Sequence, residues 1–298
     1  MATDVQPTTS GGRNSISSVT EVKERLGQFR YLADEGLATA AYLALGLERP
    51  LLLEGENGVG KTEIAKALSG LLGRELIRLQ CYEGIDTSQA LYDWHYGRQL
   101  LAVRGAGDGG AENVFTRDYL LTRPLLDALE KGDRAVLLID EIDRADDEFE
   151  AFLLELLSDF AVTIPEVGRI EASSRPLVVL TSNRTRDLHN ALRRRCLYYW
   201  VEHPDTEREF QILRLRAPEV PEPLAREVAA AVRRVRGLGL GNPPGVGESI
   251  DWANALHMLG VSTLSPETAA ATLSALVKDV DDQRVVRDRI ADVLPTAP

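Results

Sequence analysis

The sequence predicts a three-layer α/β domain around a five-stranded parallel sheet, followed by a small all-α domain. Apolar runs such as RAVLLID (134–140) show no alternation of polar and apolar residues, as expected for parallel strands that are covered on both faces. A short buried strand, a glycine-rich turn and an amphipathic helix follow one another between Pro50 and Leu72. From Asp205 onward the apolar periodicity is wholly helical. These observations together predict the fold class.

Each predicted element has its own segment of the chain. We expect residues 1–18, rich in Ser, Thr and Gly, to be disordered, the α/β domain to occupy 19–203, and a helical lid domain to occupy 204–298. The strands are expected at 50–54, 75–81, 134–140, 175–181 and 196–201. A hairpin is expected at 161–172. The lid helices are expected at 205–216, 221–236, 247–259, 266–277 and 281–293.

Composition excludes several classes of function. The formal net charge of −12 argues against general nucleic-acid binding, which needs a basic surface to displace counterions. The two cysteines, Cys81 and Cys196, lie in apolar runs and are expected to be small buried hydrophobes rather than a disulfide or a metal site. No apolar run approaches the length of a membrane span, and no signal-peptide pattern is present. A cytoplasmic protein is expected.

The strongest motif is GENGVGKT, residues 55–62, which satisfies the phosphate-loop pattern G-x-x-x-x-G-K-[ST]. Its glycines let the backbone turn so that N–H groups point at a phosphate, and the following helix directs its positive end at the same anion. Lys61 would neutralise the β- and γ-phosphates of ATP, and the Thr62 hydroxyl would coordinate Mg²⁺. The predicted nucleotide-binding residues are Gly55, Glu56, Asn57, Gly58, Val59, Gly60, Lys61, Thr62 and Glu63.

Polar residues follow two further strands. Asp140 and Glu141 end the run RAVLLID-E, a position that suits Mg²⁺ binding by Asp140 and polarisation of an attacking water by Glu141. Asn183 follows the strand at 175–181, where its amide could lie between the phosphate loop and Asp140-Glu141 and orient the water. By itself, an asparagine after a strand is more often a turn residue, so that role depends on position.

Three arginines, Arg193, Arg194 and Arg195, end a short helix at 187–195. A basic helix end complements the helix dipole and needs no further role. The functional alternative is that one of them reaches the nucleotide site of an adjacent subunit and offsets charge in the transition state.

The segment 86–103 is predicted to be a helix with Asp86 as its N-cap. Tyr92, Trp94 and Tyr96 in this segment cannot all share one helical face. They either pack on the core or on a neighbouring subunit, or they face a partner or a central pore.

Taken together, GENGVGKT, LLIDEIDRA (137–145), the hairpin, LTSNR (180–184), ALRRRC (191–196) and the helical lid resemble the AAA+ ATPases of the MoxR family. Longer stretches such as LIRLQCYEGID (76–86) and PPGVGESIDW (243–252) are similar to the CoxD-like group, which is associated with maturation of carbon monoxide dehydrogenase and related molybdenum hydroxylases. The resemblance implies a P-loop AAA+ core, Walker A at 55–62, Walker B at Asp140-Glu141 and sensor 1 at Asn183.

The resemblance also implies that Arg195 is the finger arginine, with Arg194 and Arg193 as alternatives. It implies ATP and Mg²⁺ as cofactors, a ring homo-oligomer such as a hexamer, a partner with a von Willebrand factor A domain and a metalloenzyme client. One departure stands out, because the start of the lid helix near GVGESIDW carries no arginine to serve as sensor 2. Glu248 or Asp251 marks a different arrangement, or the role is absent.

The function we expect is ATP hydrolysis coupled to remodelling of another protein. Two other classes stay open. A small-molecule P-loop kinase would share the phosphate loop but would not need Glu141, the arginine cluster or the lid. A nucleotide-gated scaffold would bind ATP without hydrolysing it.

Overall fold

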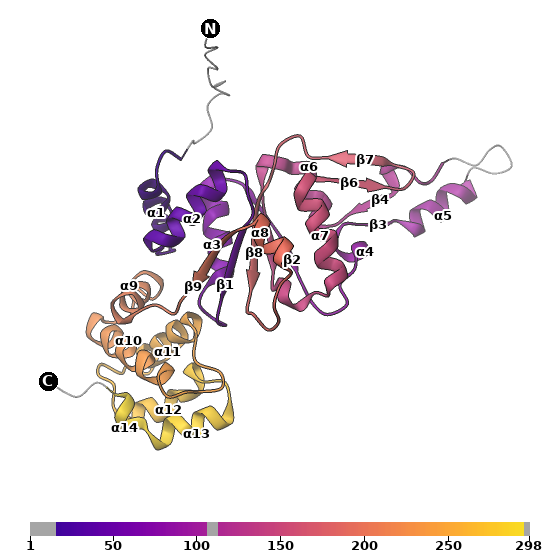
Figure 1. The fold of residues 1–298 in the computed structure, drawn as a ribbon. Coiled ribbons are helices and arrows are strands. Elements are labelled where there is room, and N and C mark those ends of the chain that lie inside the picture. The colour runs from indigo at the N-terminus through magenta and orange to yellow at the C-terminus, as the bar shows by residue number, and fades with distance from the viewer. Residues whose placement is uncertain (1–15, 106–112, 295–298) are drawn as a thin grey trace, which may run out of the picture.

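The computed structural model describes residues 16–105 and 113–294 (Figure 1). Five parallel strands form the central sheet in the order β2-β5-β8-β1-β9, which confirms the predicted sheet. The predicted disorder of 1–18 lies largely outside the described residues. The strands are β1 Leu51–Gly55, β2 Glu75–Gln80, β5 Ala135–Asp140, β8 Leu177–Ser182 and β9 Leu197–Val201.

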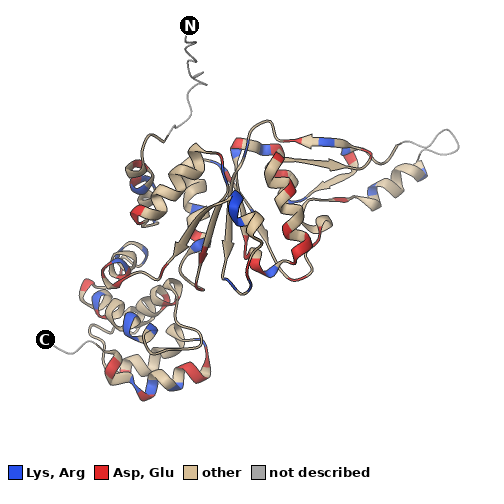
Figure 2. Ribbon diagram, in the orientation of Figure 1, with Lys and Arg blue, Asp and Glu red and all other residues tan. Residues whose placement is uncertain are grey.

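Helices cover both faces of the sheet, which completes the three layers (Figure 1). The helices of one face are α1 Val19–Gln28, α2 Glu35–Gly46 and α3 Lys61–Leu72, and those of the other are α6 Pro124–Lys131, α7 Asp147–Asp159 and α8 Asn190–Arg195. In β1, Leu51 and Leu53 pack toward the first layer and Leu52 toward the second. Both faces are therefore apolar, which explains the lack of alternation in the strand sequences. In Figure 2 the ribbon marks acidic residues along α7 and basic residues on α8.

An insertion between β2 and α6 departs from the prediction. The single helix expected at 86–103 is wrong, because the chain there forms α4 Thr87–Ala90, β3 Tyr92–Trp94 and α5 Tyr96–Gly105. Strand β3 pairs antiparallel with β4 Leu120–Thr122, so a tertiary contact overrides the local helical pattern. Asp86 does cap α4, in a capping box with Gln89.

Two of the three aromatic side chains singled out in this segment pack on the core, and the third is exposed. Tyr92 and Trp94 pack edge to face with centroids 6.2 Å apart, and Trp94 meets Phe115 in the same way at 5.4 Å. Both Tyr92 and Trp94 also lie against the core cluster under α6 and α7. Tyr96 is 64% exposed on α5. The predicted hairpin is present next to α7, as β6 Ala161–Ile164 and β7 Gly168–Glu171.

The last part of the chain is helical, with a core of its own. Its helices are α9 Thr206–Arg216, α10 Glu222–Arg236, α11 Val246–Met258, α12 Pro266–Leu276, α13 Val280–Asp288 and α14 Ile290–Val293. Trp252 is fully buried at its centre, and its indole Nε1 donates to Thr272 Oγ1 at 2.8 Å. Within 16–105 and 113–294, no helix is long and apolar enough to cross a bilayer.

Candidate nucleotide site

The phosphate loop connects β1 to α3 at the carboxyl edge of the sheet. Gly58 and Gly60 have backbone φ values of +76° and +94°, which residues other than glycine rarely adopt. Lys61 begins α3 and is almost fully buried, and burial lowers the pKa of its ammonium group to about 8. Its Nζ donates to the carbonyls of Gly55 at 2.8 Å and Glu56 at 2.6 Å. The Lys61 ammonium group and the positive N-terminal end of α3 therefore both lie at the phosphate loop, where they can attract an anion.

Asp140 lies at the end of β5 opposite Thr62. The Thr62 hydroxyl is 3.1 Å and 3.3 Å from the two carboxylate oxygens, and Thr181 Oγ1 donates to Oδ1 at 2.5 Å. Arg78 donates to Oδ2 through Nε at 3.0 Å and Nη2 at 2.6 Å. A hydroxyl and a carboxylate that face each other are the hard oxygen donors that suit Mg²⁺, so these side chains fit that ion.

Glu141 directly follows β5 in a left-handed backbone conformation, with φ +56°. Its N–H donates to Thr181 Oγ1 at 2.9 Å, so the same threonine orders both acidic residues. Gln80, at the end of β2, donates its Nε2 to the Glu141 carboxylate at 3.1 Å, and Arg144 Nε lies 3.2 Å from it. The carboxylate is therefore held by two side chains that a conformational change could release.

Asn183 follows β8, the strand that lies between β5 and β1 in the sheet. Its position therefore lies between those of Glu141 and the phosphate loop. Its backbone N–H is 3.2 Å from both carboxylate oxygens of Asp143, which is buried. Asp143 also accepts bonds from the N–H of Thr185 at 2.9 Å and its hydroxyl at 2.7 Å. Asp143 thus fixes the loop that presents Asn183.

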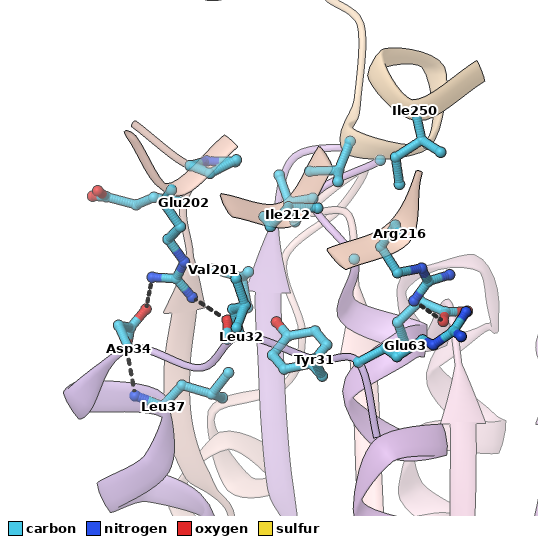
Figure 3. Close-up of a pocket in the computed structure, with 18 residues that line it drawn as sticks. Tyr31, Leu32, Asp34, Leu37, Glu63, Val201, Glu202, Ile212, Arg216 and Ile250 are labelled. Carbon is cyan, nitrogen blue, oxygen red and sulfur yellow. Dashed lines mark hydrogen bonds and ion pairs between the residues drawn. The ribbon is translucent and has the colours of Figure 1, made fainter. Parts of the chain in front are cut away.

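A cavity of about 230 Å³ opens beside the phosphate loop (Figure 3). Figure 3 shows the ring of Tyr31, from the loop between α1 and α2, among the lining side chains, and burial raises the pKa of its phenol. Apolar side chains from β9, α9 and α11 complete the walls, among them Val201, Ile212 and Ile250. A cleft whose exposed walls are mainly apolar, with charged residues also in its lining, suits a nucleotide base.

The lid contacts the cavity through two arginines of α9. Arg208 donates to Asp34 Oδ2 at 2.9 Å and to the carbonyl of Leu32 at 2.7 Å (Figure 3). Burial alone would raise the pKa of Asp34, but hydrogen bonds from the Leu37 N–H, Tyr199 and Arg208 hold it below its usual value. Arg216 lies 3.4 Å from Glu63, the last of the predicted nucleotide-binding residues.

The lid also touches the phosphate loop directly at the start of α11. The N–H of Val246 donates to the carbonyl of Gly58 at 2.8 Å, and a Cβ on Gly58 would lie 2.6 Å from the Cα of Gly245. Glu248 accepts from the N–H of Gly245 at 3.1 Å, so it caps its own helix. The lid cations among the lining residues are Arg208 and Arg216, which belong to α9 rather than α11.

The three candidate finger arginines differ in their surroundings. Arg193 Nη2 lies 2.9 Å from Glu54 Oε1 of the same chain. The side chains of Arg194 and Arg195 are exposed, and neither makes a hydrogen bond or ion pair within the part of the chain described. The structure thus brings the predicted phosphate-loop, Walker B and sensor residues to one edge and leaves Arg194 and Arg195 apart from them.

Sequence reasoning missed several polar residues that shape this site. Arg78, Gln80, Asp143 and Thr181 all lie within three residues of the carboxyl ends of β2, β5 and β8, where parallel strands gather their functional groups. Only that shared placement could have signalled them. Tyr31 reaches the cavity from the loop between α1 and α2, and Arg208 and Arg216 reach it from α9. No local pattern in the sequence marks these three residues.

Comparisons with known proteins agree with this geometry. Residues 50–196 match the family described as AAA domain (dynein-related subfamily). The chain is 26% identical to protein NorQ of Paracoccus denitrificans over 253 residues, which are 82% of this chain and 86% of NorQ. It is 31% identical over 158 residues to a ClpA homologue of Fuscovulum blasticum and 29% identical over 177 residues to the chaperone protein ClpB of Streptomyces albus G. These matches span 51% and 58% of this chain but only 18% and 17% of those longer relatives.

A solved structure shares the fold at low sequence identity. A RuvB mutant from Thermotoga maritima matches with a TM-score of 0.50 and 18% identity, over 89% of this chain and 73% of that chain. The sheet order, the phosphate loop, the Asp140-Glu141 pair and the matched family agree with one another. The chain therefore belongs to the AAA+ ATPases and is of the MoxR type.

Proposed function

We propose that the protein hydrolyses ATP with Mg²⁺ at a site that a neighbouring subunit completes, and that it uses this cycle to remodel a partner protein. One observation carries the proposal. The phosphate loop, Asp140 and Glu141 are assembled within one chain, whereas Arg194 and Arg195 are exposed arginines with no partner in the described residues. A second copy of the chain would supply the missing cation, and repetition of that contact would close a ring.

The roles follow from where each group lies. Lys61 would move from the carbonyls of Gly55 and Glu56 to the phosphates, which are stronger acceptors. Glu141, released from Gln80 and Arg144, would accept a proton from the attacking water, and Asn183 would orient that water. Arg195, or Arg194 beside it, would stabilise negative charge on the transferred phosphoryl group in the next subunit.

Mg²⁺ would be held by Thr62 and Asp140, whose oxygens already face each other. When bound, the ion neutralises charge on the phosphates. Arg78, which donates to Oδ2 of Asp140, would keep that carboxylate oriented. The apolar cavity lined by Tyr31 and Ile250 would receive the adenine.

The client is proposed from resemblance. The CoxD-like stretches noted above favour maturation of a metalloenzyme of the carbon monoxide dehydrogenase kind, with a von Willebrand factor A-domain partner. The extensive similarity to NorQ supports a MoxR-type remodeller over a metabolite kinase.

The deciding experiment measures ATPase turnover against protein concentration, with oligomer mass recorded on the same samples. We expect turnover per subunit to rise as the protein assembles. Glu141→Gln should bind ATP but lose about 100- to 10,000-fold in turnover, the range for removal of a general base. Arg195→Ala should assemble and bind ATP but lose about 1000-fold, as expected for a finger arginine.

Other outcomes would favour the other classes. Turnover per subunit that does not depend on assembly, or full activity of both Arg194→Ala and Arg195→Ala, would refute the shared site. Phosphate transfer to a metabolite would indicate a kinase. Tight ATP binding without turnover in the assembled protein, unchanged by Glu141→Gln, would indicate a scaffold.

A further inference from the structure

Glu54 is a buried carboxylate next to the phosphate loop. It is fully buried at the end of β1 and directly precedes Gly55, the first residue of the loop. An ionised carboxylate away from water is costly unless a cation and hydrogen bonds compensate for the lost hydration. The position of Glu54 therefore depends on its ionic partners.

Arg193 of α8 is the main partner. Its Nη2 lies 2.9 Å from Oε1 and 3.2 Å from Oε2 of Glu54, and Arg184 adds a longer contact of 3.9 Å. Arg193 Nε is buried too and has no hydrogen-bond partner in the part of the chain described, although the side chain as a whole is only partly buried. If Arg193 left for a neighbouring subunit, Glu54 would stay buried without its closest cation.

A second arginine holds the end of the same helix. Arg49, two residues before β1, donates to the carbonyl of Arg194 at 2.6 Å, of Arg195 at 3.0 Å and of Cys196 at 3.3 Å. Carbonyls at a helix end have no partner inside the helix, so Arg49 supplies the missing donors. Helix α8 is thus tied to residues at both ends of β1, and we expect the two to move as one body.

The phosphate loop can act on this body. Lys61 Nζ donates to the carbonyls of Gly55 and Glu56, the two residues that directly follow Glu54. Phosphate oxygens compete for that ammonium, so nucleotide binding alters the hydrogen bonding of the backbone next to Glu54. The change passes through the Glu54–Arg193 pair to α8.

On the basis of the proposed function, we propose that Arg193 is a positioning residue rather than the finger. Its ion pair with Glu54 links the phosphate loop of one subunit to the finger arginine that this subunit presents to the next. The finger is then Arg194 or Arg195, whose side chains are exposed while Arg49 holds their carbonyls.

The test compares single and paired substitutions in the assembled full-length protein, with turnover, its Hill coefficient in ATP and the melting temperature as readouts. Arg193→Gln leaves Glu54 without its main cation, and Glu54→Gln leaves Arg193 without its anion. We expect each single change to lower turnover by about 100-fold, the loss that a small misplacement of a catalytic group causes. Both should also lower the melting temperature and the Hill coefficient.

The double variant Glu54→Gln/Arg193→Gln removes both charges and lets two amides face each other. Because coupled residues are non-additive, we expect its turnover to return to within about threefold of wild type, with recovery of melting temperature and cooperativity. Arg195→Gln should instead keep the wild-type melting temperature and lose about 1000-fold in turnover if it is the finger. An exposed pair in α13, Asp281→Asn/Arg284→Gln, is the matched control and should change none of the readouts.

Two results would overturn the proposal. A double variant that recovers neither turnover nor folding would mean that the charge of Arg193 is itself required, as for a finger. A single Arg193→Gln variant with wild-type turnover, cooperativity and melting temperature would mean that the pair transmits nothing. Wild-type turnover that does not depend on assembly would instead refute the shared site, whatever the double variant does.

Discussion

The polar groups around Asp140 and the arginines at the end of α8 differ in how far one chain satisfies them. Asp140 has hydrogen-bond partners on three elements, namely Thr62 of α3, Thr181 of β8 and Arg78 of β2. The side chains of Arg194 and Arg195 make no hydrogen bond or ion pair within the described residues, although Arg49 binds their carbonyls. On the proposed function, the first region would need no second subunit and the second region would act only on a neighbour. A nucleotide would then bind a single subunit, while turnover would need two.

The largest effect is expected when the intact phosphate loop and the intact finger arginine are placed on different chains. Lys61→Ala should abolish binding at its own site, and Arg195→Ala should disable the site next door. Mixed one to one, we expect the two inactive proteins to recover turnover at about a quarter of the sites, those in which an intact loop meets an intact finger. That is a rise of about 100-fold over either variant, measured as phosphate release after subunit exchange.

The mixture has its own control. Lys61→Ala mixed with the double variant Lys61→Ala/Arg195→Ala leaves no intact phosphate loop and should stay inactive. If mass measurement shows mixed assemblies but the first mixture stays inactive, the arginine and the phosphate loop of one site belong to the same subunit.

Thr181→Val tests the polar groups around Asp140, which lie within one chain. The substitution keeps the shape but removes the hydroxyl that donates to Asp140 and accepts from the Glu141 N–H. A buried polar group left unpaired costs about 1–3 kcal/mol, so we expect turnover to fall by about 10- to 100-fold. Thr272→Val is the matched control, because it removes a buried hydroxyl bonded to Trp252 in the lid. It should lower stability to a similar degree and leave turnover per folded subunit unchanged. Equal turnover losses in the two variants would mean that Thr181 contributes only to folding.

Gly58→Ala tests how closely the lid must approach the loop. The new methyl group would lie 2.6 Å from the Cα of Gly245, on a backbone with φ +76°. We expect ATP affinity to fall by about 10-fold or more, because the lid must withdraw or the loop must deform. Gly73→Ala is the control, since its φ of +63° gives similar strain but its Cβ would meet no atom within 4 Å. Isothermal titration with an ATP analogue would compare the two variants, and equal affinities would show that the lid contact is dispensable.

These contacts also show why sequence predicted one part of the molecule better than another. The phosphate loop and β5 carry their signals locally, since a glycine spacing and an apolar run can be read within ten residues. Strand β3 has only three residues and forms because β4 supplies a ladder, in which Trp94 pairs with Leu120, 26 residues further along the chain. The local pattern of 86–103 holds no trace of that pairing.

The candidate site divides in the same way. Lys61, Thr62, Asp140 and Glu141 could be found from motifs because phosphate chemistry fixes their types and spacing. The pairing of Arg193 with Glu54 could not, because 139 residues separate them and only the sheet order brings them together. That contact distinguishes three adjacent arginines that look alike in sequence.

The smallest expected effect concerns the charge of Lys61 in the phosphate loop. Burial lowers the pKa of its ammonium group in the free protein to about 8, and bound phosphates would raise it, since they favour the charged form. The complex then binds more protons than the free protein at alkaline pH. Affinity for ATP should be constant well below pH 8 and fall as pH rises through that value, by at most about 10-fold per pH unit. Titrations with a fluorescent ATP analogue between pH 7 and 9.5 would measure this slope.

Lys61→Arg separates the charge of this residue from its titration. Arginine stays protonated over this range, so any remaining affinity should lose the decline above pH 8, even if its bulk weakens binding overall. A decline of equal steepness in Lys61→Arg would assign the titration to another group. If ATP affinity does not change with pH in the variant but falls above pH 8 in the wild type, nucleotide binding depends on the positive charge of Lys61 in the same subunit. Arg194 and Arg195 would have no part in that step, because the proposal assigns them to the neighbouring site.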